Sequence, residues 1–169
     1  PAYVEIMLAS GQLQLGEDAC IELEDTARRF ETEILGALAA HARGALLLAR
    51  GDAQGALEPL RSAFGVWQQL EAPYLAARLR VLIGRACSAL GDRDGAELER
   101  AAARAVFEKL GAARDLAALD EAVAAESSTS RSRAPAPQPA PERAAIQDVM
   151  TRFRGSRAKL TEQAAAFEE

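Results

Sequence analysis

The feature that most limits how this chain can fold is an internal repeat with a period of 40 residues. The segment from Gly44 aligns with the segment from Gly84 at this offset, and most of the matched residues are small or apolar. The clearest matches are Gly51 with Gly91, Asp52 with Asp92, Gly55 with Gly95, Ala63 with Ala103, and Trp67 with Phe107. A weaker third copy precedes them, with Gly11 at the position of Gly51. A fixed period of this length predicts stacked supersecondary units.

Each unit is predicted to consist of two helices joined by a tight turn. Small and apolar residues recur at helical spacing up to Ala49, and Gly51 then accepts the left-handed conformation that follows a helix end. Asp52 and Asp92 are expected to cap helices over 53–70 and 93–110, the first of which Pro59 should kink or deprive of a hydrogen bond. The predicted fold is therefore all-α, a solenoid of about three helical hairpins followed by a C-terminal amphipathic helix.

Composition divides the chain into a repeat domain (1–126), a linker (127–141) and a C-terminal segment (142–169). The linker, SSTSRSRAPAPQPAP, carries too little apolar surface to offset the cost of ordering it. The C-terminal segment is predicted to form an amphipathic helix with the seam residues Ile146, Met150, Phe153, Leu160 and Phe167. We expect this helix to cap the array or dock in its groove. The alternatives are pairing with a second chain to form a homodimer, and contact with a membrane surface or nucleic acid.

No combination of residues in the sequence points to catalysis. His41 is the only histidine, and Cys20 and Cys87 are too far apart for a metal-binding or redox motif. No glycine-rich phosphate-binding motif is present. We therefore expect no enzyme activity, no metal site and no cofactor.

The net charge, the cysteine content and the first residue of the chain indicate which binding partners and which cellular compartment to expect. With a net charge of −5 and no long apolar run, we expect no membrane span and no direct nucleic-acid binding by this chain. The net charge is −7 in residues 1–126 and +2 in residues 127–169, so the two parts should attract each other weakly. The small number of cysteines favours the cytoplasm. A first residue that is Pro1 rather than Met is expected of a processed product or a piece of a longer protein.

The repeated motif resembles a known family of helical repeats. Gly44, Gly51, Asp52, Gly55, Ala56 and Ala63, whose pattern returns from Gly84, resemble the tetratricopeptide repeat at a longer spacing than its usual 34 residues. The stretch ARGALLLARGDAQGALEPLRSAFGVWQQL is also similar to the helical-repeat arm of the large actinobacterial LuxR-type (MalT-like) transcription regulators. This resemblance covers about residues 1–125 and implies an arm that passes partner or effector binding to other domains. The helix-turn-helix of those regulators is not found here.

The tetratricopeptide resemblance also implies that the first helix of each unit lines a concave binding face. The residues expected there are Leu38, His41, Ala45, Leu48, Arg78, Val81, Arg85 and Ser88. Arg78 and Arg85 lie two helical turns apart on one face and would clamp an acidic or carboxylate-bearing peptide. The alternative is a solvated stripe that pairs with neighbouring acids.

We therefore expect a non-catalytic protein-interaction or effector-sensing domain of a LuxR-type regulator, with a protein or peptide as its partner. The partner would include other domains of the same regulator. The alternative is a stand-alone adaptor or scaffold whose C-terminal helix docks on its own groove or on another protein.

Overall fold

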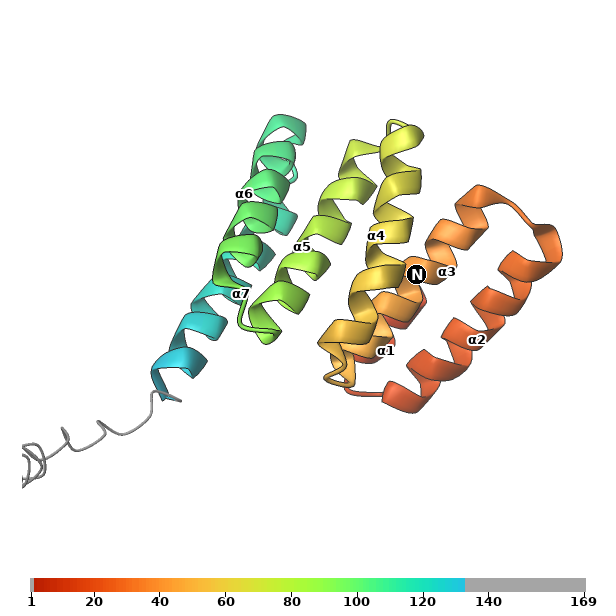
Figure 1. Ribbon diagram of the computed structural model, residues 1–169, viewed down its shortest axis with the longest axis horizontal. Coiled ribbons are helices and arrows are strands. Elements are labelled where there is room, and N and C mark those ends of the chain that lie inside the picture. Colours follow the sequence, from red (N-terminus) through yellow and green to blue (C-terminus); the bar gives the residue numbers. More distant parts are fainter. Residues whose placement is uncertain (1, 133–169) are drawn as a thin grey trace, which may run out of the picture. The chain divides into compact units, whose positions relative to one another are not determined.

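The computed structural model describes residues 2–132, which form seven α-helices and no strand (Figure 1). The helices are α1 (Ala2–Ala9), α2 (Leu13–Phe30), α3 (Glu33–Ala49), α4 (Ala53–Gln69), α5 (Pro73–Ala89), α6 (Arg93–Leu110) and α7 (Ala113–Ser132). The predicted all-α class is confirmed for these residues. Helix α7 continues to Ser132, so it overlaps the beginning of the predicted linker. The rest of the linker and the predicted C-terminal seam lie outside the described residues.

The helix ends follow the local signals in the sequence. The Asp52 carboxylate accepts a hydrogen bond from the Gly55 amide at 2.8 Å, and Asp92 accepts one from Gly95 at 2.9 Å. These bonds satisfy amides that have no partner within the first turn of α4 and α6. The left-handed glycine precedes each cap, because Gly51 and Gly91 both have φ of +84°. Helix α4 also runs without interruption through Pro59.

A second left-handed position marks the turn that leads into each following hairpin. It is occupied by Glu31 (φ +50°), Glu71 (φ +51°) and Gly111 (φ +66°), at intervals of 40 residues. Only the last of these is a glycine, the residue that adopts this conformation without a steric penalty. The backbone therefore repeats more faithfully than the sequence does.

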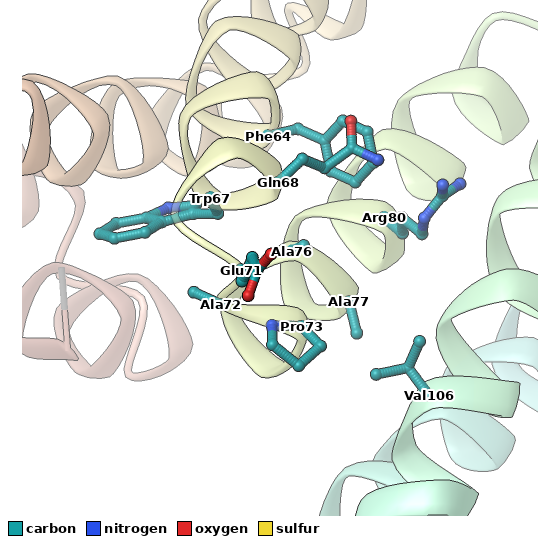
Figure 2. A pocket seen from close by; sticks show the side chains of 10 residues that line it. All are labelled: Phe64, Trp67, Gln68, Glu71, Ala72, Pro73, Ala76, Ala77, Arg80 and Val106. Atoms are coloured by element: carbon teal, nitrogen blue, oxygen red, sulfur yellow. The ribbon is translucent and has the colours of Figure 1, made fainter.

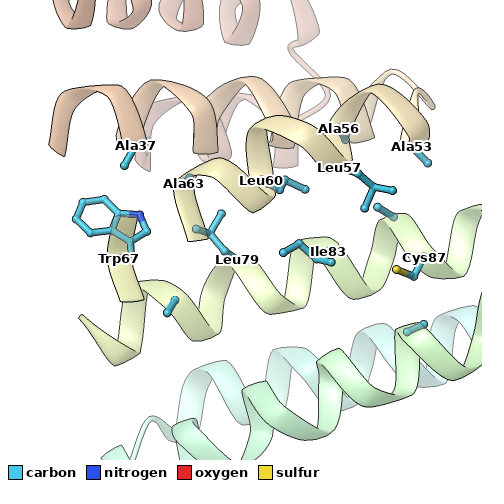
Figure 3. Close-up of a cluster of buried hydrophobic side chains, with 13 residues drawn as sticks. Ala37, Ala53, Ala56, Leu57, Leu60, Ala63, Trp67, Leu79, Ile83 and Cys87 are labelled. Carbon is cyan, nitrogen blue, oxygen red and sulfur yellow. The ribbon is translucent and has the colours of Figure 1, made fainter. Parts of the chain in front are cut away.

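The helices pack in a repeat-like arrangement. Helix α4 packs against both α3 and α5, while α1 contacts α3 and α3 contacts α5. The largest core cluster lies between α3, α4 and α5 and includes the fully buried Leu60 and Leu79 (Figure 3). Trp67 closes this cluster beside Ala37 of α3. Large side chains thus fill the layers between helices, while alanines occupy most of the remaining core positions.

Glycine allows α3 and α4 to cross at short distance. A Cβ atom on Gly44 would lie 2.5 Å from the side chain of Leu60, which is itself fully buried. Nothing comparable surrounds Gly36 on the same helix, where a Cβ would have no neighbour within 4 Å. The two glycines of α3 therefore have different roles, and only Gly44 is required by packing.

We predict that Gly44→Ala lowers the free energy of unfolding by about 2 kcal/mol, because the added methyl group would overlap the fully buried Leu60 side chain and force it to shift within the core. The matched control, Gly36→Ala, should raise it by about 0.5–1 kcal/mol, since alanine favours the helix and meets no neighbour. Urea unfolding followed by circular dichroism measures both changes. Equal effects of the two substitutions would contradict the assigned crossing.

Candidate functional site

The residues expected on a concave binding face differ widely in exposure. On α3, His41 is only 2% exposed and Ala45 is buried as well, whereas Leu38 and Leu48 are half-buried. Of the four residues expected on α5, only Arg85 is exposed. The other three expected residues, Arg78, Val81 and Ser88, are half-buried. The eight residues consequently do not form one continuous exposed surface.

Two of the polar residues among them, His41 and Arg78, lie beside a side chain of α1 that the sequence did not single out. Glu5 of α1 accepts a hydrogen bond from Arg78 of α5 through Oε2. Its other oxygen, Oε1, lies 3.2 Å from Nε2 of the buried His41 on α3, without a regular hydrogen bond between the two atoms. One carboxylate therefore connects three helices, and Arg78 makes the firmer of its two contacts.

These two neighbours favour the ionised form of Glu5. Contact with His41, followed by the bond from Arg78, lowers the pKa of Glu5 to about 2 from 4.5, although partial burial acts in the opposite direction. The carboxylate thus remains charged throughout the physiological range. Its role is to hold α1 against α3 and α5, and the interaction leaves Arg78 engaged within the domain.

A pocket of about 400 Å³ opens where α4 ends and α5 begins (Figure 2). Its walls come from α4, the turn after it, α5 and α6. The lining residues are Phe64, Trp67, Gln68, Glu71, Ala72, Pro73, Ala76, Ala77, Arg80 and Val106. Most of these side chains are apolar, so the pocket suits an apolar group of a partner. Trp67 forms the part of the pocket wall nearest the core, where its ring lies beside Ala37.

The charges at the pocket are unequal. The Arg80 guanidinium lies 4.6 Å from the centre of the Phe64 ring and forms an ion pair of 2.7 Å with Glu99, so its charge is compensated. Glu71 is exposed at the rim and has no ion-pair partner within the described part of the chain. The pocket therefore combines apolar walls with one uncompensated negative charge.

The buried thiols add no further site to the pocket. Burial raises the pKa of both Cys20 and Cys87, which keeps these cysteines as neutral, inert thiols at neutral pH. Among residues 2–132, no three histidine, cysteine or acidic residues are grouped so that they could hold a metal ion. No helix in this part of the chain is long and apolar enough to cross a membrane.

We predict that Glu5→Gln lowers the free energy of unfolding at pH 7 by at most about 3 kcal/mol, the value of a pKa shift from 4.5 to about 2. In the unsubstituted chain this contribution is complete above about pH 5 and is lost as the pH falls toward 2, because the folded state then binds the proton less readily than the unfolded state. Urea unfolding at a series of pH values measures it.

The control for this prediction is Glu22→Gln, which alters an exposed carboxylate of α2 that has no ion-pair partner among the described residues. This variant should retain the acid dependence of the unsubstituted chain. If the free energy of unfolding of Glu5→Gln decreases on acidification as steeply as that of the unsubstituted chain, the role of Glu5 is refuted.

The pocket at the α4–α5 turn is the candidate interaction site. The Glu5 contacts hold α1 against α3 and α5, the helices on which the binding face was expected. In the comparisons with known proteins, no family model, no curated protein and no solved structure matches this chain.

Proposed function

We propose that this chain is a non-catalytic protein-interaction domain, built as a tetratricopeptide-like solenoid, and that the pocket at the α4–α5 turn receives an apolar side chain of a partner. The observation that carries the proposal is a pocket of about 400 Å³ with mainly apolar walls. Such a hollow provides the buried anchor position around which protein interfaces are organised. The resemblance noted in the sequence supports the proposal that the domain belongs to a LuxR-type regulator, where it would bind a protein or another domain, and the small number of cysteines supports a cytoplasmic location.

The charge at the rim specifies the partner further. Arg80 is already paired with Glu99, whereas Glu71 is available to a cation. An apolar residue with an arginine or lysine beside it would therefore fill the pocket and pair with Glu71 at the same time. This chemistry describes a basic, amphipathic peptide or helix rather than an acidic one.

A second candidate is self-binding, in which the chain is a stand-alone adaptor. The sequence favours it because Phe153 stands between Arg152 and Arg154, which is the combination that the pocket suits. Residues 142–169 would then compete with an external partner for the same pocket. Their own sequence supplies a probe for both candidates.

We predict that a fluorescein-labelled peptide of residues 142–169 binds the protein and that Glu71→Lys weakens this binding about fivefold, a loss of about 1 kcal/mol from one reversed rim charge. The matched control is Glu31→Lys, because Glu31 has the same left-handed conformation and is exposed but does not line the pocket. Both variants change the net charge equally, so fluorescence anisotropy at one salt concentration separates the pocket from general attraction.

Two results would count against the pocket: no binding of the peptide, or equal weakening by both substitutions. The same titration on a chain that ends at Ser132, which retains the compact unit up to Ala124, tests self-binding. The shortened chain should bind the peptide more tightly than the full chain if residues 142–169 occupy their own pocket. Equal affinities of the shortened and the full chain for the peptide would contradict the adaptor candidate and favour an external partner.

A further inference from the structure

One face of α1 exposes large apolar side chains. Ile6 is 60% exposed and Tyr3 is 57% exposed, although α1 otherwise packs well through Val4, which is 2% exposed. The two residues are three positions apart, so they lie on the same side of the helix. Ala2, four positions before Ile6, is exposed as well.

The 40-residue register shows that these are core positions elsewhere in the array. Ile6 corresponds to Leu46 in α3 and to Ala86 in α5, and both of those residues are fully buried. Tyr3 corresponds to Ile83 of α5, which is 4% exposed. The repeat position of Ile6 is thus buried in α3 and α5 and exposed in α1, and the position of Tyr3 is buried in α5.

In the two closed cases, the covering residues come from the preceding hairpin. Leu46 packs in a cluster with Val4 of α1 and Cys20 of α2. Ile83 and Ala86 pack in a cluster with residues of α3 and α4, among them Leu60. Arg43, the counterpart of Tyr3 in α3, also reaches the preceding hairpin, where it pairs with Glu24 of α2 at 2.6 Å.

We propose that Tyr3 and Ile6 form a stacking face, and that this face receives a further helical hairpin of the same repeat, joined to α1 as α4 is joined to α5. The interface would continue the one already present between successive hairpins, so its chemistry is defined: small and branched apolar side chains equivalent to Val4 and Cys20. Among residues 2–132, the helix at the opposite end, α7, differs from α1 because it exposes the charged Asp120 and Glu121.

The test is a fusion of residues 33–81 directly in front of Ala2. Residue 82 is the counterpart of Ala2, so this fusion keeps the 40-residue register and places a complete hairpin before α1. The readout is the rate at which a cysteine at position 6, introduced as Ile6→Cys, reacts with a thiol reagent in the native protein. The native Cys20 and Cys87 are buried, so we expect them to react slowly.

In the chain as it stands, we expect the introduced cysteine to react at the rate of an exposed thiol, and in the fusion at least about 100-fold more slowly, since reaction then requires the hairpin to open. The matched control is Leu98→Cys, because Leu98 is 68% exposed on α6, away from α1. Its reaction rate should be the same with and without the added hairpin.

Stability provides a second readout. Ile6→Ser should leave the Tm of the present chain nearly unchanged but lower the Tm of the fusion by about 5 °C or more, as burial of the side chain requires. A fusion in which the position 6 cysteine keeps its exposed rate, including one that does not fold, overturns the proposal. So does a folded fusion whose Tm is indifferent to Ile6→Ser.

Discussion

The close approach of paired helices is the constraint on which the rest of the domain depends. At the crossing of α3 and α4, Gly44 lies so near Leu60 that even a methyl group would overlap it. At the equivalent crossing of α5 and α6, a Cβ on Gly84 would lie 3.3 Å from the carbonyl oxygen of Ala96. With the helices so near, each layer needs few large side chains, which agrees with the low aromatic content of 5%. The fixed crossings in turn set where the turns and the pocket lie.

Much of the fold could be predicted because its signals are local and occur more than once. The left-handed Gly51 and the capping Asp52 mark a turn whatever surrounds them, and their repetition 40 residues later confirms the spacing. The helices that follow these turns accordingly begin where the sequence placed them. Pro59 was expected to kink α4 or to deprive it of a hydrogen bond; the helix runs through this residue without interruption, and proline has no amide to donate.

The candidate site could not be predicted in the same way, because it depends on contacts between residues far apart in the chain. No local pattern indicates that Glu5 meets both His41 and Arg78, although the tetratricopeptide resemblance implied that both residues line a binding face. The pocket likewise needs Phe64 and Arg80 from different helices. One signal was present: a glutamate stands at position 71, where the next unit has glycine.

That glutamate has a consequence for recognition. Placing a non-glycine residue in the left-handed region costs about 1 kcal/mol of conformational free energy, so the intrinsic preference of Glu71 does not explain its conformation. The packed helices α4 and α5 on either side hold the turn in this conformation, so the fold itself sets where Glu71 stands at the rim of the pocket. Because no loop has to be ordered on binding, a partner would lose little conformational entropy on the side of this domain. The unfavourable conformation of Glu71 thus fixes the backbone of the α4–α5 turn in the arrangement that a partner would meet.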